Sequence, residues 1–182
     1  MIRYLLNKML VAMRNRYDYD VGYMQEILKT DLGAFLKLMA FQTMPSHSGK
    51  LPAAVLYAAR ITTLLSKDCG PCTQLAVNIA LEEKVSPSIV QAIIDKDMPS
   101  LPGDIALVVR FTELVLAHSP EADDLRKEIV ALWGSEGLIA LAYSISSYRV
   151  YPALKYALGY GRACTRILVN ETAAAVLTQK NG

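Results

Sequence analysis

The sequence predicts an all-α protein, on three observations. Apolar residues recur every three or four positions along most of the 182 residues, which is the spacing of amphipathic helices. Strand signals are almost absent, because the main β-branched cluster, residues 105–109, lies inside a longer helical pattern. Helix-breaking residues gather in two short segments, 44–52 and 98–103. We therefore expect a succession of helices joined by short connections.

Each helix is bounded by the apolar pattern and by the residues at its ends. The expected ranges are 2–15, 21–30, 32–43, 51–66, 69–84, 87–96, 104–118, 122–133, 136–149, 152–168 and a short tail near 171–179. Ser86 and Ser119 each place a capping hydroxyl before a proline that suits a first helical position. Gly134 and Gly159 stand where left-handed helix ends are expected. Pro152 interrupts a strongly apolar run, so we expect a kink or a restart of the helix there.

Length and composition fit a single domain over residues 1–182. With 53% hydrophobic and 20% charged residues, a chain of this size buries roughly 70% of its unfolded surface and needs no disulfide to hold a core. Neither of the two helix-breaking segments is long enough to separate domains. We expect N-terminal helices over 1–43 and a helical core over 51–168, with helices 51–66 and 69–84 forming a tight hairpin.

The first sixteen residues combine basic and apolar side chains. The apolar ones recur at helical spacing: Ile2, Leu5, Leu6, Met9, Leu10 and Met13. Charges interrupt this run and no small-residue cleavage site follows it, so we expect an amphipathic helix that docks on the domain or on a sister subunit. No apolar run reaches the roughly 18 uncharged residues of a membrane span. We therefore expect a cytoplasmic protein without a membrane partner.

Charge and cysteine content narrow the function classes further. The formal net charge is +2, and no long Lys/Arg run interleaves with aromatic residues, so nucleic acid is not an expected partner. Three cysteines are too few and too unevenly placed for the disulfide framework of a secreted protein. Cys69 and Cys72 therefore fit an intracellular redox or metal pair, and Cys164 is left over.

The segment from Cys69 to Cys72, Cys-Gly-Pro-Cys, is the stretch that predicts chemistry. Positions i and i+3 of a helix share a face, so the two sulfurs can meet without a large backbone movement. Asp68 is the expected N-cap of this helix. Unpaired N–H groups and the positive end of the helix dipole favour the thiolate at such a position. We expect both sulfurs side by side at a solvent-reachable place, open to reversible oxidation.

A metal site is the other use of a close cysteine pair. A structural zinc site usually needs four ligands, commonly as two close pairs. His47 and His118 are the only histidines, and neither has metal-ligand spacing to the cysteines. Zinc would have to recruit Cys164 or one of these distant residues, so we expect no metal. His118, near the end of its helix, is better placed to contact the last carbonyl groups.

The Cys-Gly-Pro-Cys sequence also occurs in the thioredoxin active site, but the strand and the βαβ pattern that surround it there are missing. A CxxC at a helix start in an all-helical chain resembles the alkylhydroperoxidase D-like, carboxymuconolactone decarboxylase family. The resemblance runs over residues 51–167 and includes the segments 107–114, 138–143 and 150–159. It implies an all-α bundle of that type and a homo-oligomer, and the mean hydropathy of +0.25 fits apolar burial between subunits.

Peroxidases of this family relay protons to the thiols through a histidine and a glutamate. The histidine position, four residues after Cys72, holds Ala76, and the glutamate position, twelve residues before Cys69, holds Tyr57. Alanine has no proton to move, and an ordinary phenol, with a pKa of about 10, is a poor base near neutrality. We interpret the other polar residues near the CxxC as surface or hydrogen-bonding groups: Lys67, Gln74, Asn78, Glu82 and Glu83.

Aromatic residues and a cation are concentrated in the late helices: Tyr143, Tyr148, Arg149, Tyr151, Tyr156 and Tyr160. We interpret the tyrosines as core and interface packing, with a pocket over the thiols as the alternative. Arg149, near the kink expected at Pro152, has two alternatives to a surface ion pair. It can hold an anionic substrate or pair with a buried carboxylate such as Glu113.

The leading hypothesis is a thiol–disulfide oxidoreductase that reduces a peroxide or a partner disulfide. One of Cys69 and Cys72 attacks as the thiolate and the other resolves the intermediate, in an order that the sequence leaves open. The reductant is expected to be another protein or a small thiol, and no bound cofactor is implied. Two rivals remain: a decarboxylase-like lyase on a small lactone acid, using Arg149, Arg60 or His118, and a non-catalytic assembly protein with a relic thiol pair.

Overall fold

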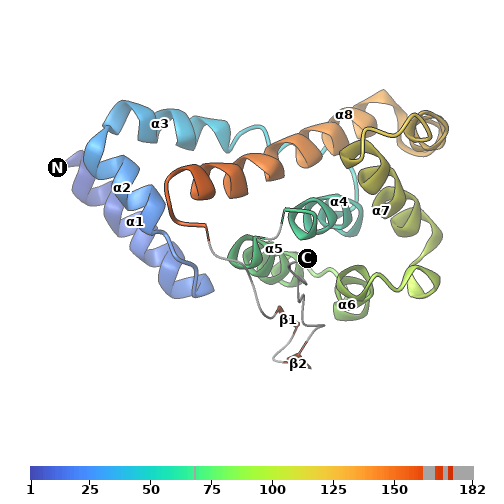
Figure 1. Cartoon of the computed structure of the whole chain (residues 1–182), viewed down its shortest axis with the longest axis horizontal. Coiled ribbons are helices and arrows are strands. Elements are labelled where there is room, and N and C mark those ends of the chain that lie inside the picture. Colours follow the sequence, from blue (N-terminus) through green and yellow to red (C-terminus); the bar gives the residue numbers. More distant parts are fainter. Residues whose placement is uncertain (68, 162–166, 170–171, 174–182) are drawn as a thin grey trace, which may run out of the picture.

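The structure, a computed structural model, describes residues 1–67, 69–161, 167–169 and 172–173, and it confirms the all-α prediction (Figure 1). The N-terminal helices are α1 (Ile2–Tyr17), α2 (Gly22–Thr30) and α3 (Leu32–Phe41). The helices that follow are α4 (Ala53–Leu65), α5 (Gly70–Glu82), α6 (Pro87–Asp95), the 3-10 turn η1 (Met98–Ser100), α7 (Gly103–Leu116) and α8 (Ala122–Ala157). The two helix-breaking segments fall between helices, as expected.

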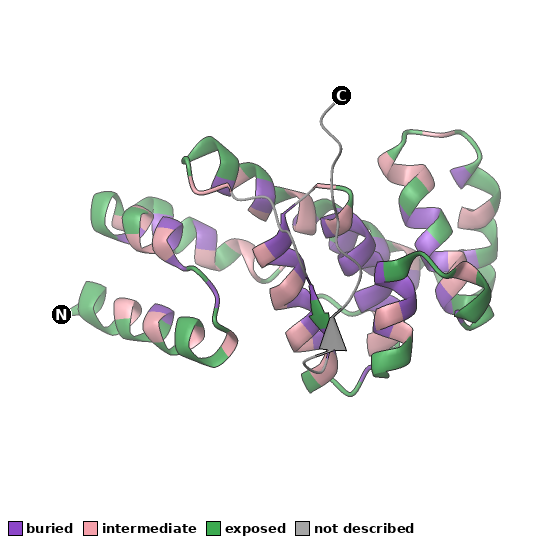
Figure 2. Cartoon of the chain, turned by 60° about the horizontal axis from the view of Figure 1, so that its bottom comes forward, coloured by how far each residue is buried: buried purple, intermediate pink, exposed green. Residues whose placement is uncertain are grey.

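Helix α4 is the centre of the core. It packs against α5, α6, α7 and α8, and every residue from Val55 to Leu64 is buried. A helix that is apolar around nearly its whole circumference is stable only when its neighbours enclose it. Figure 2 shows this enclosed region as the concentration of buried residues in the middle of the molecule. The hairpin of α4 and α5 that the sequence predicts is formed.

The N-terminal helices pack around a smaller apolar cluster of their own. Its buried members are Leu10, Tyr19, Val21, Tyr23, Met24, Leu28, Phe35 and Leu38. One end of α1 is joined to α5 through Glu82, whose carboxylate accepts hydrogen bonds from Arg16 at 3.0 and 3.1 Å and from the Tyr17 hydroxyl at 2.8 Å. The sequence predicts that the first helix docks on the domain or on a sister subunit. The structure shows that it docks on its own domain.

Helix α8 is two helices that meet at Gly134. This residue has φ 69° and ψ −179°, a conformation outside the helical region that glycine adopts without steric cost. The break predicted there is confirmed. Of the kink or restart expected at Pro152, the restart is wrong, because the dihedral angles of α8 stay helical through this buried proline. Packing of α8 against α4 and α7 offsets the hydrogen bond that the proline cannot donate.

The helix expected over 152–168 is also wrong at residues 158–161 and 167–168, while residues 162–166 lie outside the described part of the chain. Gly159, at φ 78°, ends α8 in the left-handed conformation. The chain then forms two short antiparallel strands, β1 (Leu168–Val169) and β2 (Thr172–Ala173). Apart from 172–173, the tail helix expected near 171–179 lies outside the described residues.

A side chain of α5 holds β1 in place. The Gln74 amide donates to the Leu168 carbonyl at 2.9 Å and accepts from the Leu168 amide at 2.7 Å. The same amide group donates to Asn78 at 2.8 Å. The interpretation of Gln74 and Asn78 as a hydrogen-bonded pair is confirmed. Gln74 in addition binds the backbone of β1.

The connection between α3 and α4 lies against α8 at Gly49. Its φ is 53°, and a Cβ atom there would lie 2.7 Å from the Glu136 carbonyl oxygen and 2.8 Å from the Ala140 Cβ. Both distances are too short for a side chain. Only glycine therefore allows this connection to lie so close to the helix.

Among the described helices, α8 is the one that has the length and apolar composition of a membrane-spanning helix. It is interrupted at Gly134 and packs against α4 and α7. Its buried residues include Ser144, Ser147 and Lys155. The helix thus carries polar side chains into the interior of this fold.

Candidate functional site

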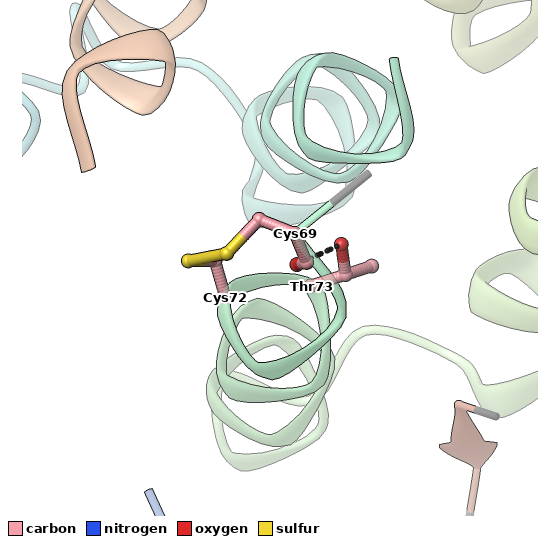
Figure 3. Close-up of a disulfide and its surroundings, with 3 residues drawn as sticks. All are labelled: Cys69, Cys72 and Thr73. Carbon is pink, nitrogen blue, oxygen red and sulfur yellow. Dashed lines mark hydrogen bonds between the residues drawn. A yellow bond between two sulfur atoms is a disulfide. The ribbon is translucent and has the colours of Figure 1, made fainter. Parts of the chain in front are cut away.

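Cys69 and Cys72 are joined by a disulfide at the start of α5 (Figure 3). Their Cα atoms lie 5.3 Å apart, within the usual range for a disulfide. Cys69 is the N-cap residue of α5, so Cys72 occupies the first helical turn. The sequence predicted Cys69 to lie one residue further inside, and Asp68, the expected cap, is outside the described residues. The structure thus brings together the two cysteines that the spacing paired.

Thr73 fixes the backbone on which the disulfide sits. The Cys69 carbonyl accepts the Thr73 amide at 2.9 Å and the Thr73 hydroxyl at 3.0 Å. Figure 3 shows Thr73 and the disulfide on opposite sides of the start of α5. The first turn is therefore held from the side that faces away from the sulfur atoms.

The expectation of solvent-reachable sulfurs is wrong. Cys69 is 1% exposed and Cys72 is 5% exposed, and both belong to the main apolar core. Residues distant in sequence lie near Cys72, since Tyr19 and Tyr23 from the N-terminal region and Tyr151 from α8 line the same space as this cysteine. A large partner therefore has no direct contact with either sulfur in this conformation.

Cys72 nevertheless lines an internal space, named here the inner cavity, with a volume of about 130 Å³. Its lining residues are Met13, Tyr19, Tyr23, Met24, Gln42, Pro45, Leu64, Cys72, Leu75, Ala76, Ile79, Tyr148 and Tyr151. All of them are buried or half-buried. The cavity is large enough for a few non-hydrogen atoms and places them beside Cys72.

Phenol groups form much of the wall of the inner cavity. Burial raises the pKa of Tyr19 to about 12 and raises the pKa of Tyr23 and of Tyr151 still further. The Tyr151 hydroxyl donates to the Gln42 side-chain oxygen at 2.9 Å. The Tyr23 hydroxyl has no hydrogen-bond partner in the described part of the chain. At neutral pH these phenols are uncharged and hold their protons.

A second space, named here the outer cavity, adjoins the inner one and has a volume of about 450 Å³. Gln42, Pro45 and Tyr148 line both cavities. The outer cavity is further lined by Ser46, Ser48, Leu51, Ala53, Leu56, Tyr57, Arg60 and Glu83. Its serines and its glutamate are exposed, whereas Tyr57 and Arg60 are buried. The outer cavity therefore opens at the surface and shares part of its wall with the space beside Cys72.

Arg60 is the buried cation of the outer cavity. Its side chain donates to the Pro45 carbonyl at 2.6 Å and to the Ser144 hydroxyl at 3.4 Å. The guanidinium lies over the ring of Tyr57 at 4.8 Å and over the ring of Tyr148 at 5.3 Å, measured to the ring centres. Two aromatic faces thus partly replace the water that the cation has lost.

The two relay positions of the suggested family lie near the disulfide but carry no relay groups. Ala76 lines the inner cavity, one helical turn beyond Cys72. Tyr57 lines the outer cavity, where burial raises its pKa to about 12, with Arg60 acting in the opposite direction. A phenol with a raised pKa is an even weaker base at neutral pH than an ordinary one.

The other residues singled out in the sequence do not join this site. Arg149 lines a separate surface hollow with Lys67 and Tyr156. Glu113 is exposed, so the buried pair proposed for Arg149 and Glu113 is wrong. His47 packs edge-on against Tyr143 with ring centres 5.6 Å apart.

The metal alternative gains no support from the structure. His118 is the second residue after the end of α7, in a left-handed conformation. Within the described ranges, no cluster of three or more His, Cys, Asp or Glu residues is arranged to hold a metal. Cys164 lies outside those ranges.

Sequence reasoning missed the contribution of the N-terminal region to the site. Met13, Tyr19, Tyr23 and Gln42 all line the inner cavity, although they precede the region that resembles the family. Their spacing indicates only that they pack within helices, and a local pattern cannot show which helix lies near the cysteines. Of the late tyrosines, Tyr148 and Tyr151 line the cavity, as in the pocket alternative, while Tyr143 and Tyr156 are exposed.

Comparison of the chain with protein-family models, with curated proteins and with solved structures finds no match.

Proposed function

We propose that the protein is a thiol–disulfide oxidoreductase of the alkylhydroperoxidase D-like kind, and that it reduces small peroxides in a reducing, cytoplasmic environment. The observation that carries this proposal is the Cys69–Cys72 disulfide with Cys72 on the wall of the inner cavity. A disulfide between residues this close closes and opens with little change in the backbone. The cavity supplies the place where a reacting molecule meets the sulfur.

The reaction balances with a dithiol and a hydroperoxide. The Cys72 thiolate attacks the terminal peroxide oxygen, the O–O bond breaks, and the leaving alkoxide takes a proton to become an alcohol. Cys72 is then a sulfenic acid. The Cys69 thiol attacks its sulfur, the disulfide forms and water leaves. Two further thiol groups from a reductant restore the dithiol and become a disulfide themselves.

Access to the site favours small reactants. Cys69 is almost fully buried, and Cys72 contacts a space of about 130 Å³. Hydrogen peroxide and short alkyl hydroperoxides fit this volume, whereas a folded protein with a disulfide does not. We therefore assign the first attack to Cys72 and expect a small oxidant in preference to a protein disulfide.

The test is peroxide turnover by the purified, reduced protein with dithiothreitol as reductant. We expect turnover of hydrogen peroxide and tert-butyl hydroperoxide, and little reduction of insulin disulfides. Cys72→Ser abolishes turnover. Cys69→Ser stops after one oxidation event and leaves a sulfenic acid at Cys72, which dimedone labels and mass spectrometry locates.

Cys164→Ser is the matched control, because it removes the third cysteine and leaves the pair intact. It should keep wild-type turnover. Unchanged peroxide turnover in Cys72→Ser would reject the proposal. Decarboxylation of a lactone acid that survives loss of both Cys69 and Cys72 would instead favour the lyase alternative.

A further inference from the structure

The outer cavity holds a positive charge for which the described part of the chain supplies no carboxylate partner. Arg60 is 7% exposed. The salt bridges of the described residues join other groups, and none includes Arg60. A buried guanidinium stays charged at neutral pH, and burial without a counter-charge is costly. An anion in the cavity would supply that counter-charge.

The surroundings of Arg60 suit a small organic anion. Hydroxyl groups of Ser46 and Ser48 stand at the exposed rim, and the rings of Tyr57 and Tyr148 flank the guanidinium. A guanidinium presents paired N–H groups that match a planar carboxylate. The volume of about 450 Å³ exceeds that of a short carboxylic acid.

The position of Arg60 relates this charge to the disulfide. Tyr148, beside the guanidinium, lines the inner cavity as well as the outer one. The space around Arg60 and the space beside Cys72 therefore share Tyr148 as a wall. Glu83 is the one carboxylate among the lining residues, and it is exposed at the rim. Its negative charge opposes the approach of an anion.

From these observations we propose that the outer cavity binds the carboxylate of the small molecule that reacts at Cys72, with Arg60 as the counter-charge. The part of this inference that concerns the reaction at Cys72 rests on the proposed function, whereas the binding of a carboxylate at Arg60 is independent of it. The carboxylate belongs either to the hydroperoxide or to the thiol reductant. Both have the same recognition chemistry, and kinetics with matched reactants distinguishes them.

Binding is measured first, by calorimetric titration of benzoate and of its neutral counterpart benzamide. The protein is the Cys69→Ser/Cys72→Ser variant, so that redox activity plays no part. We expect benzoate to bind at least tenfold more tightly than benzamide, since a hydrogen bond to a charged group contributes roughly a factor of ten or more. Arg60→Gln should remove this preference. Equal binding of the two ligands would overturn the proposal.

Two exposed residues keep the test independent of the folding of Arg60→Gln. Glu83→Gln removes the negative charge at the rim and should strengthen benzoate binding several-fold at low salt, with a smaller gain at high salt. Ser48→Asp adds a negative charge and should weaken it. Glu128→Gln, an exposed change on α8 outside both cavities, is the matched control. An identical benzoate affinity in Glu83→Gln and Glu128→Gln would contradict the proposal.

Kinetics of the cysteine-containing protein then identifies the source of the carboxylate. One pair is 2-hydroperoxy-2-methylpropanoate and tert-butyl hydroperoxide, and the other is 3-mercaptopropanoate and 3-mercaptopropanol. If the carboxylate is on the oxidant, Arg60→Gln lowers kcat/KM for 2-hydroperoxy-2-methylpropanoate but not for tert-butyl hydroperoxide. If it is on the reductant, Arg60→Gln lowers kcat/KM for 3-mercaptopropanoate but not for 3-mercaptopropanol. Loss in neither acid would overturn the link between Arg60 and the reaction, while a protein with no turnover at all would fail the proposed function and leave the binding result standing.

Discussion

Single residues decide what the site can do, and Ala76 is the clearest case. It lies one turn beyond Cys72, with a small side chain, and the inner cavity occupies the space in front of it. A larger side chain at this position would project into that space. The disulfide is thus surrounded by neutral phenols and apolar groups instead of a base that moves protons to and from the thiols.

Ala76→His should raise the rate of peroxide reduction. The imidazole would enter the inner cavity beside Cys72 and supply the missing general base, an effect that is typically worth about 10²-fold or more in rate. The measurement is kcat/KM for hydrogen peroxide across pH 5 to 9, where a new titration near the pKa of histidine should appear.

Ala76→Leu is the control for this prediction, because it fills the same space without a titratable group. It should lower or leave unchanged the rate of peroxide reduction. A similar rate increase in both variants would mean that filling the cavity, and not proton transfer, is responsible.

At the scale of elements, polar side chains of α5 attach α1 and β1 to this helix. Gln74 bonds to the backbone of β1 at both of its amide atoms, and Glu82 bonds to two residues of α1. These attachments join segments that are far apart in sequence. Loss of either should loosen one segment locally and leave the α4–α8 core intact.

Gln74→Leu should release β1 from α5. The change removes two hydrogen bonds to Leu168, with a cost of about 1 to 2 kcal/mol in the free energy of unfolding. Hydrogen–deuterium exchange at the Leu168 amide should become faster. Asn78→Ala removes only the bond between the two side chains and should leave that exchange nearly unchanged. Equal exchange rates in wild type and Gln74→Leu would contradict the assignment.

The attachment of α1 should depend on pH. Hydrogen bonds from Arg16 and then Tyr17 hold the pKa of Glu82 below its ordinary value. A carboxyl with a lowered pKa stabilises the native state above its unfolded-state pKa, and that contribution disappears as the pH falls through the lowered native pKa.

Glu82→Gln should therefore be slightly less stable than wild type at pH 7, and the difference should close below about pH 4. Urea unfolding at both pH values measures this. The effect is small because the groups are exposed. A difference that grows toward low pH would have the wrong sign for the proposed role. Glu128→Gln is the control and should show no such closing difference.

At the scale of the whole molecule, α1 has a broad apolar stripe of which only one side is covered. Leu6, Leu10 and Met13 pack into the N-terminal cluster. Ile2, Leu5 and Met9 point outward and are 53%, 59% and 47% exposed. An exposed stripe of this kind is typical of a subunit contact. We propose that a second copy of the chain covers it.

Light scattering coupled to size exclusion should then give a multiple of the 20.0 kDa subunit mass. Leu5→Glu should shift the protein toward the monomer, since it places a charge in an apolar contact. Val130→Glu is the control. It changes an exposed residue in the part of α8 before Gly134, which lies at the opposite end of the molecule from α1 (Figure 1), and it should leave the mass unchanged. A mass of one subunit for the wild type at high concentration would contradict the prediction.

Local patterns predicted the helices well because burial follows the helical period. Val55 to Leu64 and the break at Gly134 are legible in the sequence for that reason. The end of α8 was predicted only in part: the left-handed helix end expected at Gly159 is confirmed, but the apolar run continues past it and placed the end of the helix too late. The strand at Leu168 depends on Gln74, a partner that no local pattern identifies.

The candidate site was predicted in the same uneven way. The pairing of Cys69 and Cys72 follows from their spacing within one helical turn. Their burial does not, since the surroundings of Cys72 include Tyr19 and Tyr23, which are far away in the sequence. Arg60 sits within an apolar helix pattern; Tyr57, three residues earlier, shares its helix face, but nothing in the local sequence indicates Tyr148, the second ring that flanks it.

Gly49 has a bearing on which molecules can enter. The connection that carries Pro45, Ser46 and Ser48 forms one side of the outer cavity, and Gly49 holds it within van der Waals contact of α8. A methyl group at this position would clash with α8 and displace the connection, which would change the shape of the outer cavity. One backbone position that contacts neither the sulfurs nor the guanidinium thus constrains the size of the molecules that can enter.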